Sequence, residues 1–145
     1  MINIAITGPK EFYNRSLVFY QLDYLLNSVA SNIQIVEGGT TCLDNLIKDW
    51  ANSKNIPCIE IVPNWNLFGS GAEMIRNQEM IRESQGLVVF YDGSFELETI
   101  LESALNKGIE VHVVDIFYNS RTYGKAFQLI LKEKGGKYDE QEFNF

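Results

Sequence analysis

The fold is decided by the stretch IQIVEGGTTCLDNLIKDWA, residues 33–51. It opens on a β-branched apolar run, Ile33–Val36, which has the length of a buried strand. A pair of glycines follows, and then Leu43, Leu46, Ile47 and Trp50 recur at helical spacing. A strand, a glycine turn and an amphipathic helix in this order predict one half of a βαβ unit.

The same alternation extends outward in both directions. Further apolar runs of strand length occupy Ile2–Ile6, Ile56–Val62, Leu87–Tyr91 and Ile109–Ile116, all apolar enough to be covered on both faces. Helical spacing covers residues 22–29 and 97–105, and a weaker helix is predicted over residues 72–84. We therefore predict an α/β fold: a Rossmann-like three-layer sandwich whose five-stranded, mostly parallel sheet carries helices on both faces.

The chain has 145 residues, the length of one domain. We expect that domain to cover residues 1–116. Residues 117–145 are expected to form a C-terminal helix, Tyr123 to Lys134, and a tail that packs on or extends from the same domain. The tail carries Tyr138, Phe143 and Phe145 but is too short for a core of its own, so a homodimer or higher homo-oligomer is expected. A disordered tail is the alternative.

Composition narrows the classes of function. The formal net charge of −7 excludes an extended nucleic-acid surface, which needs clustered Lys and Arg. No run of 18 apolar residues exists, and the N-terminus leads directly into a strand, so we expect a cytoplasmic protein without membrane contact. A single histidine, His112, and two cysteines, Cys42 and Cys58, show no metal-ligand spacing, and no metal site is expected.

Four predicted strands end at turns that contain glycine, and parallel strands place such ends along one edge of a sheet. The first two turns supply Thr7, Gly8, Pro9 and Lys10, and then Gly38, Gly39, Thr40, Thr41 and Asp44. The glycines allow close approach of a ligand, Lys10 offers a charge to a phosphate, and the amides after the second strand form a nest for an anion. The alternatives are a tight turn at Lys10 and a capping box between Thr41 and Asp44.

The third and fourth turns add aromatic and polar groups. Trp65 is a candidate to stack on a base, with Arg76 and Asn77 near a helix start as contacts for a phosphate or ribose. The fourth turn contributes Asp92, Gly93 and Ser94. The competing interpretations are a lid over the core for Trp65, solvation for Arg76 and turn capping for Asp92.

In order, these turns resemble the SLOG superfamily, the Rossmann-like group that includes the DprA-type and LOG-type proteins. The resemblance is closest to its small stand-alone YspA/YpsA-related members from bacteria and phages, and it covers roughly residues 2–116. It rests on the turns at residues 7–10, 38–44 and 91–94, and above all on the order Trp65, Gly69, Gly71, Arg76-Asn77 and Met80. For a phage-encoded member, the host cytoplasm is the expected compartment.

Three departures from that pattern bear on chemistry. Cys42 stands where the second turn of such proteins has another glycine, and Glu96-Leu97 replace a Gly-Thr pair in the fourth turn. The LOG-type enzymes, which cleave a base from a ribose phosphate, carry a glutamate at the place taken here by Ile100. The resemblance therefore favours ligand binding over glycosidic hydrolysis by that route.

Three functions follow as hypotheses. The first is binding or sensing of a nucleotide or nucleotide-derived small molecule, without catalysis and with no cofactor required. The second is an enzyme acting on the N-glycosidic bond of a nucleoside, nucleotide or NAD-like ligand, as in the deoxyribosyltransferase-type enzymes, with Asp92, Glu96 or Glu98 as the catalytic candidate. The third is a structural or protein-binding role with a degraded pocket.

Overall fold

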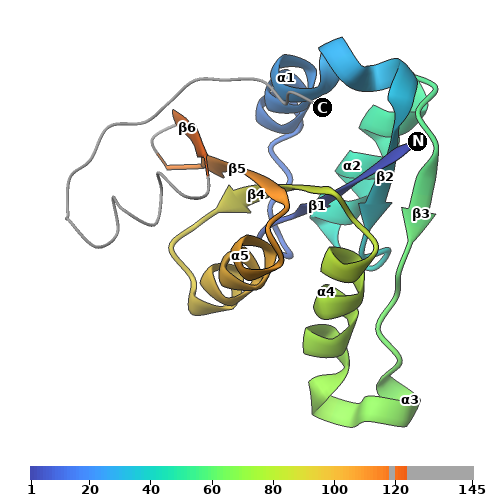
Figure 1. Cartoon of the computed structure of the whole chain (residues 1–145), viewed down its shortest axis with the longest axis vertical. Helices are drawn as coiled ribbons and strands as arrows, with labels where there is room; N and C mark the ends of the chain where they lie inside the picture. Colours follow the sequence, from blue (N-terminus) through green and yellow to red (C-terminus); the bar gives the residue numbers. More distant parts are fainter. Residues whose placement is uncertain (118–119, 124–145) are drawn as a thin grey trace.

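The computed structural model describes residues 1–117 and 120–123 (Figure 1). One sheet runs through the molecule in the order β3-β2-β1-β4-β5-β6. Its strands are β1 (Ile2–Thr7), β2 (Ile33–Glu37), β3 (Cys58–Glu60), β4 (Gly86–Tyr91), β5 (Glu110–Asp115) and β6 (Ser120–Tyr123). The helices are α1 (Arg15–Leu26), α2 (Cys42–Ser53), α3 (Trp65–Phe68), α4 (Ala72–Arg82) and α5 (Phe95–Lys107), with the 3₁₀ helices η1 (Asn27–Asn32) and η2 (Gly69–Gly71).

The predicted Rossmann-like α/β fold is confirmed. Strands β1 to β5 are all parallel, in the order 3-2-1-4-5. The chain moves outward from β1 to β3 and then returns to place β4 against the other side of β1. The strand order therefore reverses between β1 and β4, and the carboxyl ends of these two strands flank the crevice where such folds bind ligands.

Two hydrophobic cores lie on the two faces of the sheet. Helices α1 and α2 cover one face, where Leu22, Ile47 and Trp50 pack on Ile4 and Phe90. Helices α4 and α5 cover the other face (Figure 1), and their core residues are Met80, Ile81, Leu97, Leu101 and Ala104. Both cores are contiguous and fully buried, as the apolar runs of the inner strands predict. None of the helices in the described ranges is long and apolar enough to cross a membrane.

The third strand differs from its prediction. The predicted run Ile56–Val62 shortens to β3, which pairs with β2 over only three residues. It is an edge strand, so it lacks a second neighbour, and Ile59 and Val62 are exposed rather than covered on both faces. In the loop that follows, Asn64 caps the short helix α3 by accepting a hydrogen bond from the amide of Leu67.

The sixth strand was not predicted. β6 pairs antiparallel with β5, and Arg121 in it donates from Nη1 to the side-chain oxygen of Gln21 at 3.0 Å. Tyr123, expected to begin a helix, instead ends this strand. The rest of that predicted helix lies outside the described residues, and so do the tail aromatics. Dimerisation through the tail therefore stays a prediction.

One buried side chain joins α1 to α2. Trp50 is fully buried, and its indole Nε1 donates to the carboxylate of Asp23 at 2.9 Å. Lys54 pairs with the same carboxylate oxygen at 3.0 Å. These contacts lower the pKa of Asp23 and counter the opposing effect of burial. The two helices on this face are thus held together by packing and by a shared carboxylate.

Truncating Trp50 should be costly. Trp50→Ala should lower the free energy of unfolding by about 3–5 kcal/mol, because it leaves a cavity in the core. Trp50→Phe keeps most of the apolar contact and loses the hydrogen bond, so about 1–2 kcal/mol is expected. Urea denaturation followed by circular dichroism measures both. A Trp50→Phe variant as stable as wild type would contradict the contribution assigned to the indole–carboxylate bond, and a Trp50→Phe loss as large as that of Trp50→Ala would contradict the contribution assigned to packing.

Candidate functional site

Four segments meet at the switch point of the sheet. The turn after β1, the turn after β2, helix α4 and the start of α5 line one small cavity of about 20 Å³. Its lining consists of Thr7, Gly8, Lys10, Gly38, Thr41, Asp44, Arg76, Asn77, Met80, Glu96 and Leu97. The structure therefore brings together residues from three of the four predicted turns and from α4, at the edge where a ligand site was expected.

The turn after β2 is filled by a carboxylate of the chain itself. Asp44 accepts hydrogen bonds from the amides of Gly38, Thr40 and Thr41 at 3.1–3.2 Å. Thr41 accepts in turn from the amide of Asp44, which completes the capping box at the start of α2. The capping interpretation is thus confirmed. The three amides expected to hold an anion from a ligand already hold the anion of Asp44.

The fourth amide of this turn is also taken. The amide of Gly39 donates to Glu37 Oε2 at 2.5 Å. Glu37 is fully buried at the end of β2, with Lys48 Nζ 3.9 Å from Oε1 and Lys48 in turn 2.5 Å from Glu60. Burial raises the pKa of Glu37 to about 7, and the nearby charge of Asp44 acts in the same direction. Glu37 therefore supports the turn through the amide of Gly39, with a carboxyl group whose pKa lies near neutral pH.

Arg76, in α4, also holds the turn after β2 in place. The side chain is buried, its Nη1 donates to the carbonyl oxygen of Gly38 at 3.0 Å, and its Nε donates to Asn77 Oδ1 at 2.8 Å. A Cβ added to Gly38 would overlap that Nη1, so a side chain here would push the guanidinium away from the turn. Arg76, predicted as a ligand contact, thus uses its charge to join α4 to the turn after β2.

Lys10 is engaged as well. Its Nζ lies 2.5 Å from a carboxylate oxygen of Glu73 at the start of α4, and its side chain is half exposed. The backbone carbonyl of Lys10 accepts from the amide of Cys42, which joins the first turn to the second. Gly8 packs closely here, because an added Cβ would come within 2.7–2.8 Å of Leu43 and Phe90. The first turn is thus pressed against both of its neighbours.

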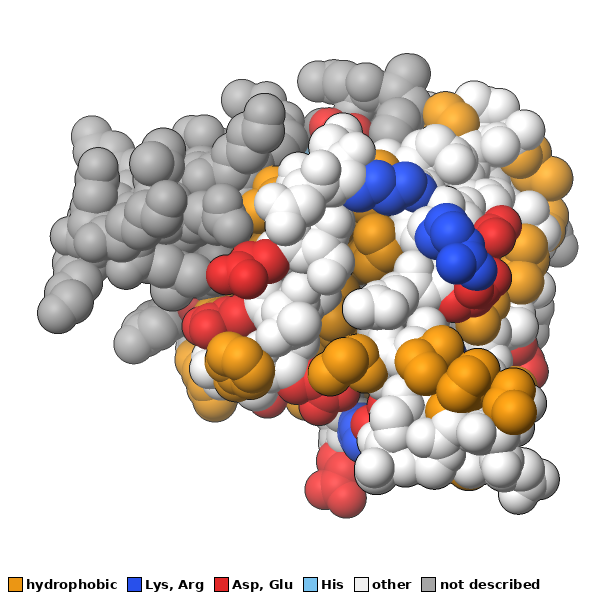
Figure 2. Space-filling model, turned by 60° about the horizontal axis from the view of Figure 1, so that its bottom comes forward, with side chains coloured by type: hydrophobic (Ala, Val, Ile, Leu, Met, Phe, Trp, Pro, Cys, Tyr) orange, Lys and Arg blue, Asp and Glu red, His pale blue; other side chains and the backbone are white. Residues whose placement is uncertain are grey.

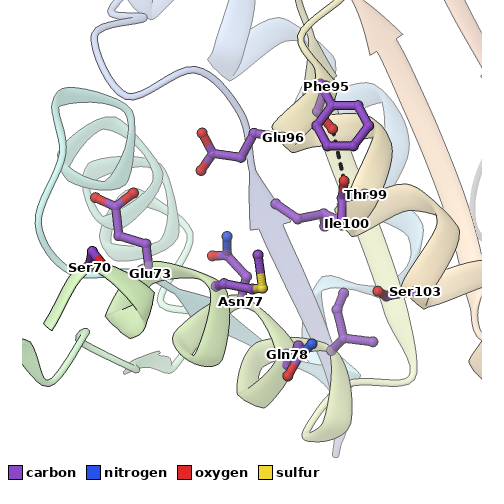
Figure 3. Close-up of a pocket in the computed structure, with 11 residues that line it drawn as sticks. Ser70, Glu73, Asn77, Gln78, Phe95, Glu96, Thr99, Ile100 and Ser103 are labelled. Carbon is purple, nitrogen blue, oxygen red and sulfur yellow. Dashed lines mark hydrogen bonds between the residues drawn. The ribbon is translucent and has the colours of Figure 1, made fainter. Parts of the chain in front are cut away.

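A larger groove of about 260 Å³ adjoins the small cavity and lies between α4 and α5 (Figure 3). The two spaces share Asn77 and Glu96 in their linings. Glu73 and Asn77 extend from α4 and Glu96 and Ile100 from α5, on opposite sides of the groove. The remaining lining residues are Ser70, Met74, Gln78, Ile81, Phe95, Thr99 and Ser103.

Several predicted site residues lie elsewhere. The lining of the two cavities does not include Pro9, Gly39, Thr40, Trp65, Asp92, Gly93 or Ser94. Trp65 is half exposed in α3, Asp92 accepts from the amide of Ser94, and Ser94 caps α5. Of the three catalytic candidates, Glu96 lines both spaces, whereas Glu98 accepts a hydrogen bond from the hydroxyl of Tyr91 at 2.5 Å.

Residues 2–68 match the family described as "YAcAr: YspA, cpYpsA-related SLOG family". The match shows the SLOG family over this part of the chain, which is less than half of its length. No curated protein and no solved structure matches the chain. The matched part runs from β1 to the end of α3 and includes the turns after β1 and β2. Helices α4 and α5, which form the walls of the larger groove, follow it in the sequence.

Sequence reasoning missed most of the groove beside the SLOG match. Glu73, Gln78, Thr99 and Ser103 follow no motif and were not singled out as site residues. One feature of the sequence could have located these residues at the site. The predicted helices over residues 72–84 and 97–105 follow adjacent strand ends on one face of the sheet. The pairing of Lys10 with Glu73, between residues 63 positions apart, had none.

Exposed hydrophobic side chains gather at this end of the molecule (Figure 2). They belong to the segment around α3 and to the flanks of α4 and α5: Val62, Trp65, Leu67, Phe68, Met74, Ile75 and Phe95. Met74 and Phe95 line the groove itself, and both are mostly exposed. The groove thus opens onto an apolar rim.

The raised pKa of Glu37 predicts a dependence of stability on pH. Between pH 4.5 and about 7 the folded SLOG domain holds a proton on Glu37 that the unfolded chain has released. The stability contributed by this proton is complete below pH 4.5 and is lost as the pH rises through about 7. Glu37→Gln removes this loss, so its stability relative to wild type should rise by up to about 3 kcal/mol across that range.

Urea denaturation at closely spaced pH values measures this difference. Glu102→Gln is the matched control, because it removes an exposed carboxylate of α5 and leaves the surroundings of Glu37 unchanged. The control should keep the wild-type pH dependence. A Glu37→Gln variant whose stability runs parallel to wild type at every pH would contradict the prediction.

Proposed function

We propose that this chain binds a nucleotide-derived small molecule at the carboxyl ends of β1 and β4. The observation that carries the proposal is the pair of adjoining spaces at the switch point, one bordered by the turns of the SLOG domain and one between α4 and α5. A largely apolar groove with a few converging polar side chains is the usual form of a small-molecule site. SLOG domains are thought to bind nucleotide-derived ligands, which supports this ligand class.

The positions of Asn77 and Glu96 support the same site. Both residues line the groove and the small cavity, so a ligand in the groove would meet an amide and a carboxylate at its inner end. Arg76 and Asp44 fix the turn that faces them. Polar groups held in place by other contacts favour specific binding, because little side-chain freedom is lost when the ligand arrives.

A second function is favoured by one observation. Glu73 and Glu96 project from facing helices into the same groove, and a pair of carboxylates is the usual equipment for cleaving a glycosidic bond. In such an enzyme one carboxylate protonates the leaving group and the other assists water or attacks the sugar. Incubating the protein with nucleosides, nucleotides and NAD, followed by chromatography, tests this. Release of free base that Glu96→Gln abolishes would establish catalysis.

Arg76 provides the test of the binding proposal. Arg76→Ala removes the hydrogen bond to Gly38 and loosens the turn, so affinity for a nucleotide-derived ligand should fall by about 1.5–3 kcal/mol. Arg76→Lys is the control that keeps the charge but lacks the forked geometry, and it should recover only part of the affinity. Isothermal calorimetry measures binding, and thermal melting verifies the fold. Unchanged affinity in a folded Arg76→Ala variant would contradict the role assigned to the turn after β2 in binding.

A further inference from the structure

Within the described part of the chain, each cationic side chain at the site is already paired with another group of the protein. Lys10 and Arg76 are the two cationic residues that line the small cavity, and the groove is lined by none. Lys10 is paired with Glu73, and Arg76 donates to the Gly38 carbonyl and to Asn77. A phosphate would have to displace one of these pairings.

The backbone amides of the turn after β2 are also already hydrogen-bonded within the protein. The amides of residues 38–41 donate to Asp44 and Glu37, two carboxylates of the chain itself. A phosphate at this turn would meet Asp44 at close range, and the repulsion between two anions would oppose binding. At the place where such folds commonly hold a phosphate, this protein thus has a carboxylate of its own, that of Asp44.

The groove offers the opposite chemistry. Its walls include Met74, Ile81 and Ile100, which suit the faces of a flat ring. Its polar groups include the carboxylates of Glu73 and Glu96 and the side-chain amides of Asn77 and Gln78. Carboxylates only accept hydrogen bonds when ionised, so they favour a ring that carries amino groups or a positive charge.

We propose that the ligand of this site is a nucleoside without a phosphate, and that its ring occupies the groove between α4 and α5. The inference rests on the proposed function and narrows its ligand class. The volume of about 260 Å³ suits it, because ligand pockets for larger molecules run from about 300 to 1,000 Å³. A dinucleotide would exceed the groove and bring two phosphates to a site with no uncommitted cation in its described lining.

The first experiment compares each ligand with its phosphorylated form. Adenosine, guanosine, cytidine, uridine and the cationic nicotinamide riboside are titrated into the full-length protein by calorimetry at low ionic strength, each beside its 5′-monophosphate. At least one nucleoside should bind, and its monophosphate should bind about tenfold more weakly because of repulsion by the site's carboxylates. Tighter or equal binding of the monophosphate overturns the inference and leaves the proposed function standing.

Binding of neither form overturns the proposed function together with the inference. The two failures are therefore distinguishable in one set of titrations.

The second experiment changes the charge. Glu73→Gln removes a carboxylate from the groove and releases Lys10 from its pair, so affinity for the monophosphate should rise by about fivefold. Adding Lys10→Ala to that variant should remove most of the gain. Glu102→Gln is the matched control, since it removes a carboxylate from an exposed position of α5 outside the groove lining. A gain as large in the control would overturn the role assigned to Glu73 and Lys10.

The third experiment tests the position of the ring. Ser103→Trp fills the groove from α5 and Gln78→Trp fills it from α4, and either should abolish nucleoside binding. Glu102→Trp should leave binding within about twofold of wild type, because it adds the same side chain at an exposed position of α5 outside the groove lining. Thermal melting identifies any variant that has not folded, and the other then decides. A folded tryptophan variant with wild-type affinity overturns the placement of the ring.

Discussion

The hydrogen bond from Arg76 to the carbonyl oxygen of Gly38 is the contact on which the arrangement of the site depends. It joins α4 to the turn after β2 across 38 residues of sequence, and it is buried. A buried guanidinium without its acceptor is costly, so the helix and the turn must hold their relative positions. Gly38 is part of the same constraint, since a side chain there would displace the guanidinium from its acceptor.

Asp44 transmits this constraint to α2. Its carboxylate accepts from three amides of the turn that Arg76 contacts, and its own amide is capped by Thr41. Near the start of a helix a negative side chain is also favoured by the helix dipole. The start of α2 is thus stabilised at the expense of anion binding, because the same donors serve one carboxylate or one ligand phosphate, and not both.

The sequence predicted the fold well because its strongest signals are periodic. The buried strands β1, β2, β4 and β5 and the helices α2, α4 and α5 follow the apolar spacing closely. β3 was predicted too long and β6 was missed, because edge strands lack that signal. β3 is largely exposed, and β6 has the sequence Ser-Arg-Thr-Tyr. Their place is set by pairing with a neighbour, which a single sequence does not reveal.

The candidate site was predictable in position and much less so in chemistry. Topology alone places the turns after β1, β2 and β4 at one edge, so Thr7, Gly8 and Gly38 were expected there. Whether a charge is available to a ligand depends on long-range partners. Lys10 and Arg76 looked like phosphate contacts in the sequence, and their partners Glu73 and Gly38 are known only from the fold.

Ile100 makes one wall of the groove apolar at a position that bears on its chemistry. It is almost fully buried, and it lines the groove and also a smaller adjoining space shared with Thr7 and Met80. In the LOG-type pattern that the fourth turn resembles, this position carries a glutamate. A carboxylate here would stand among Ile81 and Met80 and would need a partner to remain charged. The isoleucine instead gives the groove an apolar wall, which suits the face of the ring that we propose as its occupant, with Glu73 and Glu96 as acceptors in the same lining.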